Sequence, residues 1–149
     1  MNTTNVKDIV VVGASAGGVE ALSVLVASLP SHLRACVLIV MHLSPHYPSE
    51  LDSILRSKAT MPVVAARGGE PLHHGRIYLA RSDRHLMISD GALRVTRGPR
   101  ECRARPSIDV LFRSAAVTLG PRVIGVILSG ALDDGTAGLW AVKDHGGDG

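Results

Sequence analysis

A serine lies in the short loop that follows the first apolar run of the chain. The loop reads Gly13-Ala-Ser-Ala-Gly17, which is G-x-S-x-G between a predicted strand and a predicted helix. In this context the small neighbours allow a sharp turn, and the hydroxyl of Ser15 projects as a nucleophile beside a helix N-terminus. A phosphate-binding loop and simple helix–strand packing remain open as alternatives. A serine replaces a glycine of the dinucleotide fingerprint, however, and no P-loop lysine follows.

A serine becomes an effective nucleophile only beside a base, and His42 is the best placed histidine. It follows the second apolar run directly, so we expect it at the same edge of the sheet as Ser15. His46 is a competitor farther along the same loop. Two acids, Asp133 and Asp134, stand in a third loop of this kind, where one of them could orient the imidazole. Spacing does not choose between them, and either could instead begin the next helix.

The elements that must position these residues alternate along the chain. Continuous β-branched runs bounded by glycine or proline predict strands, and apolar residues at helical spacing predict helices. The predicted strands cover residues 9–12, 36–41, 63–66, 75–80 and 123–128, and the predicted helices cover 19–29, 49–57, 107–119 and 136–145. Asp90-Gly91 between two alternating runs predicts a hairpin with a type I′ turn. The fold class is therefore α/β: a doubly wound, mostly parallel sheet with helices on both faces, Rossmann-like in three layers, carrying an antiparallel hairpin insert.

Composition excludes several functional classes. The 149 residues are 46% hydrophobic and 19% charged, which fits one folded domain rather than a disordered chain. Aromatic residues are 3% and the net charge is +3, so a nucleic-acid platform is not expected. We find no signal peptide and no apolar run long enough for membrane insertion, which favours a cytoplasmic protein. The arginine-rich stretch 94–105 reads as a solvated loop or as a contact for an acidic partner.

Four motifs in order resemble the catalytic domain of the chemotaxis protein-glutamate methylesterase family, and they span nearly the whole chain. They are GASAGGVEA from Gly13, MHLSP from Met41, RPSIDVLF from Arg105 and LSGALDDG from Leu128. The family uses a serine–histidine–aspartate triad. Its motifs place these roles at Ser15, His42 and Asp134, so the resemblance decides between the two aspartates.

The resemblance implies hydrolysis of glutamyl γ-methyl esters on the cytoplasmic domains of methylated chemoreceptors, with glutamine deamidation as an accompanying activity. Backbone N–H groups near Ala16 or His42, together with Ala131, form the expected oxyanion site, although many relatives have methionine at the position of Ala131. No metal or cofactor is required. A separate response-regulator or methyltransferase protein is a further partner to consider.

Two departures from the family pattern lead to further expectations. Regulated members carry an N-terminal receiver domain, whereas here the catalytic strand begins eight residues from Met1. Family domains also continue beyond Gly146-Gly147 into another strand and helix. We therefore expect residues 1–149 to form a single receiver-less catalytic domain without those two elements. The alternatives are a non-catalytic binding module of the same fold and a nucleotide-binding α/β protein that uses residues 13–18.

Overall fold

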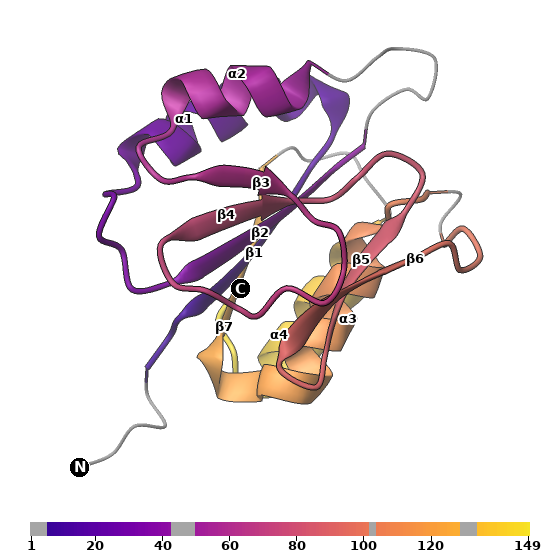
Figure 1. The fold of residues 1–149 in the computed structure, drawn as a ribbon. Coiled ribbons are helices and arrows are strands. Elements are labelled where there is room, and N and C mark those ends of the chain that lie inside the picture. The colour runs from indigo at the N-terminus through magenta and orange to yellow at the C-terminus, as the bar shows by residue number, and fades with distance from the viewer. Residues whose placement is uncertain (1–5, 43–49, 102–103, 129–133) are drawn as a thin grey trace.

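Five parallel strands form the central sheet of the computed structural model, which describes residues 6–42, 50–101, 104–128 and 134–149. The order across the sheet is β3 (Val63–Ala65), β4 (Arg76–Leu79), β2 (Cys36–Met41), β1 (Ile9–Ala14) and β7 (Val123–Ile127). The chain starts in β1, builds the sheet outward on one side and later returns to the other side as β7 (Figure 1). Such a reversal is the place where doubly wound folds form their sites, at the carboxyl ends of the strands.

Helices cover both faces of the sheet. One layer contains α1 (Val19–Ser28) and α2 (Leu51–Lys58), and the opposite layer contains α3 (Ile108–Leu119) and α4 (Thr136–Asp144) (Figure 1). Alternate residues of β1 enter the two cores: Val11 packs in the core that includes α3, and Val12 in the core that includes α1. Burial on both faces is why these strands are continuous apolar runs rather than alternating ones.

The hairpin forms a separate two-stranded antiparallel sheet of β5 (His85–Ser89) and β6 (Ala92–Thr96). Asp90 and Gly91 have φ values of 54° and 74°, and positive φ at both central residues is the requirement of a type I′ turn. The backbone N–H of Ile88 donates to the hydroxyl of Ser114 at 3.0 Å, which ties the hairpin to α3.

The predicted fold class is confirmed, with strand and helix limits close to the expected ones. Two short 3-10 helices, η2 (Ala16–Gly18) and η3 (Gly120–Arg122), were not predicted. Cys36 is buried in β2, and burial together with the charge of Asp8 raises the pKa of its thiol to about 12. None of the helices in the described residues has the length and apolar character needed to cross a membrane.

Candidate active site

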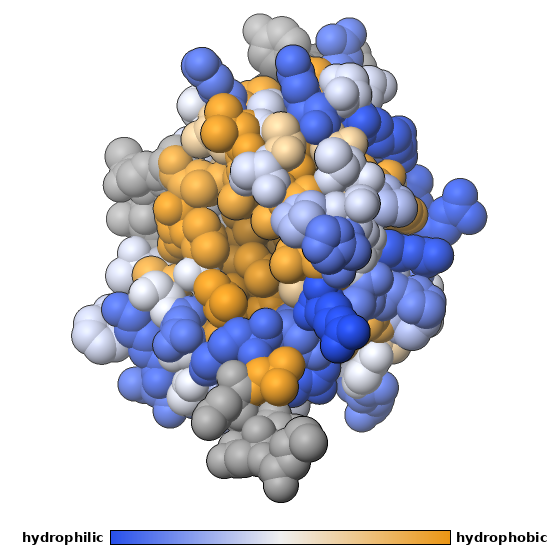
Figure 2. All heavy atoms as spheres, turned by 90° about the vertical axis from the view of Figure 1, so that its left-hand side faces the viewer, coloured by the Kyte–Doolittle hydropathy of each residue, from blue (hydrophilic) through white to orange (hydrophobic). Residues whose placement is uncertain are grey.

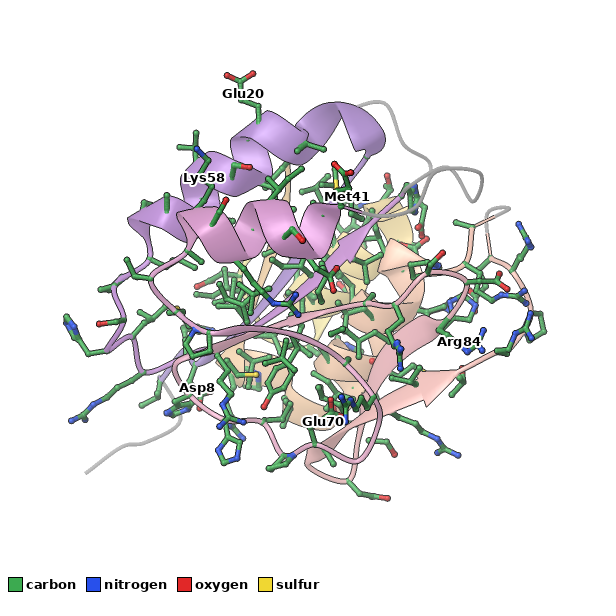
Figure 3. The ribbon with its side chains drawn as sticks, turned by 45° about the horizontal axis from the view of Figure 1, so that its top comes forward. Asp8, Glu20, Met41, Lys58, Glu70 and Arg84 are labelled. Atoms are coloured by element: carbon green, nitrogen blue, oxygen red, sulfur yellow. The ribbon has the colours of Figure 1, made fainter. Side chains whose placement is uncertain are left out.

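The backbones of Ser15 and His42 lie side by side at the carboxyl edge of the sheet. Ser15 follows Ala14 of β1, His42 follows Met41 of β2, and Ala14 and Met41 are partners in the parallel register. The N–H of His42 donates to the carbonyl of Ala14 at 2.9 Å. Figure 3 labels Met41 at this end of β2. The backbones of Ser15 and His42 therefore lie at the same edge of the sheet, as expected.

The turn at Ser15 depends on its small neighbours. Ser15 has extended backbone angles, and its carbonyl accepts a hydrogen bond from the N–H of Gly18 at 2.8 Å as η2 begins. A Cβ at Gly13 would lie 2.6 Å from the side chain of Ile108 in α3. Glycine is needed at position 13 because the first turn of α3 packs directly against the end of β1.

A buried carboxylate bonds to the imidazole of His42. Oδ2 of Asp134 accepts a hydrogen bond from Nε2 of His42 at 2.6 Å, and Asp134 is only 3% exposed. Because a carboxylate accepts, Nε2 carries the proton, and Nδ1 is the acceptor nitrogen of the neutral ring. Through these two residues the structure joins the loop after β2 to the segment that follows β7.

The same carboxylate closes the N-terminus of α3. Oδ1 of Asp134 accepts from the hydroxyl of Ser107 at 2.7 Å and from the N–H of Asp109 at 2.8 Å, and Oδ2 accepts from the N–H of Ile108 at 2.6 Å. Burial alone would raise the pKa of this carboxyl, but the hydrogen bonds from His42 and these α3 donors outweigh it and lower the pKa. Asp134 is therefore a fixed negative charge at neutral pH.

A second carboxylate performs the reciprocal task for α4. Oδ1 of Asp109, in the first turn of α3, accepts from the N–H of Gly135 at 2.9 Å and from the N–H of Gly138 at 2.6 Å. Asp134, just before α4, thus closes the N-terminus of α3, and Asp109, in the first turn of α3, closes the N-terminus of α4. This arrangement satisfies the orphan donors of both helices and fixes Asp134 relative to the sheet.

Sequence reasoning missed the roles of Ser107 and Asp109. Their pattern is that of an ordinary helix start, a serine cap and an acid in the first turn, and Ser107 does accept from the N–H of Val110 at 3.3 Å. Nothing local in that pattern indicates that both side chains also bond to the 134–138 segment. The R-P-S-x-D motif of the resemblance was the available signal.

For the other predicted site residues the structure gives no side-chain contacts. His46, Ala131 and Asp133 lie outside the described residues. Ala16 begins η2, directly after Ser15. Within the part of the chain that the structure describes, no three His, Cys, Asp or Glu side chains are grouped as metal ligands.

The arrangement has the parts needed for acyl transfer. A hydroxyl and an imidazole come from adjacent strand ends, and a buried ionised acid holds the imidazole in one tautomer. The side chain of His42 is 22% exposed, whereas that of Asp134 is 2% exposed. These are the roles that a serine nucleophile, its base and an orienting acid would fill.

Curated relatives match this chain over nearly its whole length. A relative from Methanosarcina mazei named protein-glutamate methylesterase/protein-glutamine glutaminase 2 is 36% identical, over 97% of this chain and 41% of its own length. One of the same name from Anaeromyxobacter dehalogenans is 39% identical, over 94% of this chain and 41% of its own. The chain therefore spans about two fifths of the length of these curated relatives.

The likeness extends to three dimensions. The crystal structure of the Thermotoga maritima CheB methylesterase catalytic domain matches with a TM-score of 0.86 at 32% identity, covering 94% of this chain and 76% of that one. Residues 10–148 match the family model described as CheB methylesterase. With both the fold and nearly the full sequence in agreement, the chain belongs to the CheB methylesterase family.

Proposed function

We propose that this chain is a serine hydrolase that removes the methyl group from glutamyl γ-methyl esters on the cytoplasmic segments of chemoreceptors, giving glutamate and methanol. Deamidation of glutamine side chains at the same site is the accompanying activity. The observation that carries the proposal is the 2.6 Å hydrogen bond between Asp134 and His42, at the sheet edge where Ser15 follows β1. The names of the relatives point to the same two reactions.

The reaction proceeds through an acyl-enzyme. Nδ1 of His42 takes the proton of the Ser15 hydroxyl while Oγ attacks the ester carbonyl carbon. The tetrahedral intermediate collapses, the bond to the methoxy group breaks, and His42 returns the proton so that methanol leaves. Water, deprotonated in turn by His42, then attacks the carbonyl carbon of the glutamyl ester of Ser15. The bond to Oγ breaks, His42 returns the proton to Oγ, and the glutamate product leaves.

Two further groups support these steps. Asp134 stays ionised and keeps the Nε2 proton of His42 in place, which leaves Nδ1 free to act as the base. Backbone N–H groups at Ala16 and Ala131 are the proposed donors to the oxyanion, because a donor on the residue after the nucleophile is well placed for this role.

The direct test is release of methanol from methylated receptor fragments. Ser15→Ala should remove nearly all turnover and leave the circular dichroism spectrum and melting temperature close to those of the wild type. Ser28→Ala is the matched control, since its hydroxyl donates only to the carbonyl of Leu25 on the exposed end of α1. Wild-type turnover by Ser15→Ala would refute the proposal.

A further inference from the structure

Positive charge is concentrated in one segment of the chain, residues 81–105. It holds seven of the sixteen basic residues, all arginine, and three acids, for a net charge of +4. Because the whole chain has a net charge of +3, the other 124 residues together carry −1. The charge excess of this protein therefore belongs to the β5–β6 hairpin and the loops on either side of it.

Three arginines of this segment converge on a single carboxylate. Asp83 accepts contacts from Arg105 at 2.7 Å, Arg97 at 2.8 Å and Arg100 at 3.8 Å. Nη1 of Arg84 also donates to the backbone carbonyl of Asp83. We call these four arginines the arginine surface. One carboxylate balances one guanidinium, so the arginine surface keeps a net charge of about +3.

The arginine surface is open to solvent. The side chains of Arg97 and Arg100 are 59% and 57% exposed, whereas that of Arg105 is 15% exposed and is held by Asp83 and the carbonyl of Gly98. Figure 3 shows guanidinium nitrogens gathered around the label of Arg84, at the end of the molecule that carries the hairpin. Arg105 is thus held in place beneath the cluster, and the exposed side chains of Arg97 and Arg100 are available to a partner.

Hydrogen bonds connect the arginine surface to the candidate active site. His85 of β5 donates from Nε2 to the carbonyl of Pro99 at 2.7 Å, and its Nδ1 accepts from the N–H of Ser107 at 3.2 Å. Ser107 in turn donates to Asp134. Arg105 lies two residues before Ser107, a separation of at most about 7 Å along the chain. The arginine surface therefore adjoins the segment that holds the orienting acid.

We propose that the arginine surface docks an acidic protein segment and so presents its ester to Ser15, an inference that rests on the proposed function. Guanidinium groups bind carboxylates in a planar, two-point geometry, and three of these arginines already converge on the carboxylate of Asp83. The substrate would supply such groups, since each glutamyl ester becomes a carboxylate after hydrolysis. Residues 81–105 contain no Phe, Trp or Tyr, and His85 is buried, so base stacking does not favour a nucleic acid here.

Two synthetic helical peptides test this docking. Each carries one glutamyl γ-methyl ester, flanked by glutamates in the first peptide and by glutamines in the second. For the wild type, KM should be about fivefold lower for the glutamate peptide at low ionic strength, and the difference should shrink as salt is added. The double variant Arg97→Gln/Arg100→Gln should lose this preference and retain kcat. The matched control is Arg34→Gln/Arg76→Gln. It alters two exposed arginines at the amino ends of β2 and β4, away from the site, and should keep the preference for the glutamate peptide.

The outcomes separate this docking from the proposed function. Equal KM values for both peptides, or a preference that survives the double variant, would overturn the docking, while hydrolysis of either peptide would still support the esterase. If neither peptide is hydrolysed, the proposed function fails. Anisotropy of a labelled glutamate peptide with the same variants then tests the docking alone, and an unchanged Kd in the double variant would overturn it. Tighter binding of labelled single-stranded DNA than of the glutamate peptide would also overturn it.

Discussion

At the scale of single residues, Asp134 links the chemistry of the site to the stability of the fold. Its carboxylate bonds to His42 and also accepts two backbone N–H groups and one hydroxyl at the start of α3. A neutral side chain at this position would weaken both sets of contacts. Rate and stability should therefore change together when Asp134 is altered.

Exchange of the two neighbouring aspartates for asparagine tests this assignment. Asp134→Asn places an amide NH₂ among N–H donors. At the position of Oδ2 it cannot accept from the N–H of Ile108, and at the position of Oδ1 it cannot accept from the N–H of Asp109, so at least one contact must break. We expect methanol release to fall on the order of a hundredfold or more, because His42 loses the partner that fixes its tautomer. The melting temperature should also fall. Steady-state kinetics and thermal denaturation measure the two effects.

The matched control is Asp133→Asn, which removes the same charge one position away. It should keep most of the activity. A larger loss for Asp133→Asn than for Asp134→Asn would mean that the acid was assigned one residue away from its true position.

At the scale of elements, α3 and α4 approach closely at their N-terminal turns. Gly138 lies in the first turn of α4, and a Cβ there would be 2.6 Å from the Cβ of Phe112 and 3.0 Å from Oδ1 of Asp109. The missing side chain lets the Gly138 N–H reach Asp109. Helix contact and reciprocal capping at this point depend on one glycine.

Gly138→Ala should therefore push α4 away from α3. We expect a loss of about 1–3 kcal/mol in the free energy of unfolding, the usual cost of overpacking, despite the better helix propensity of alanine. Denaturant unfolding measures it. Ala137→Ser adds one atom at an exposed position of the same helix and should cost less than about 0.5 kcal/mol. Equal stability of Gly138→Ala and wild type would show that the two helices have room to move apart.

The elements themselves were largely predictable from the sequence, because their signals are local. The apolar run of β2 predicted its limits, Cys36–Met41, and Asp90-Gly91 predicted the hairpin turn from the backbone angles that it requires. The joining of Asp134 to the N-terminus of α3 was not predictable in this way. An acid before a helix is expected to cap that helix, whereas Asp134 caps another one, and only the packing of α3 against α4 determines this choice.

At the scale of the whole molecule, a second network of charged side chains links the amino ends of the strands, at the end of the sheet opposite the site. Asp8, before β1, is buried and accepts two hydrogen bonds from Arg122 and one from His74, each at 2.8 Å. Figure 3 labels Asp8 at that end of the sheet. Hydrogen bonds from Arg122 lower the pKa of Asp8 against the opposing effect of burial, and His74 adds to the lowering. The network joins the starts of β1, β4 and β7.

Acid should therefore destabilise the protein through two carboxylates. The pKa values of Asp8 and Asp134 are both lowered in the folded state, so their contributions are complete above the unfolded value near 3.8 and are lost as pH falls through the folded pKa. We expect the melting temperature to drop steeply below about pH 4. Asp8→Asn should lower it at neutral pH and make the acid drop shallower. An unchanged acid slope in Asp8→Asn would exclude Asp8 as a source of the effect.

Among the described residues, β7 is an edge strand of the five-stranded sheet, and its outer side has only a single isolated bridge. Asp148 forms a parallel bridge with Ile124, and its backbone bonds to Val123 at 3.0 Å and to Gly125 at 2.7 Å, so strand pairing begins on this edge. Apolar residues that are only partly buried continue the α1 side of the sheet, among them Val10, Val126 and Leu128. Figure 2 shows a broad apolar area on one side of the molecule, bordered by hydrophilic side chains.

A further strand and helix beside β7 should therefore stabilise the domain. We predict that joining the C-terminal part of the Thermotoga maritima domain after Gly149 raises the melting temperature, lowers binding of a hydrophobic dye and suppresses self-association. The added strand would pair the open N–H and C=O groups of β7, and each 100 Å² of apolar surface covered would contribute about 2.5 kcal/mol. An extension of equal length made of glycine and serine is the control, since it adds chain without apolar surface. If both extensions leave the melting temperature and the association state unchanged, the edge of β7 is already stable. Covering the apolar surface beside it would then add nothing to the free energy of unfolding.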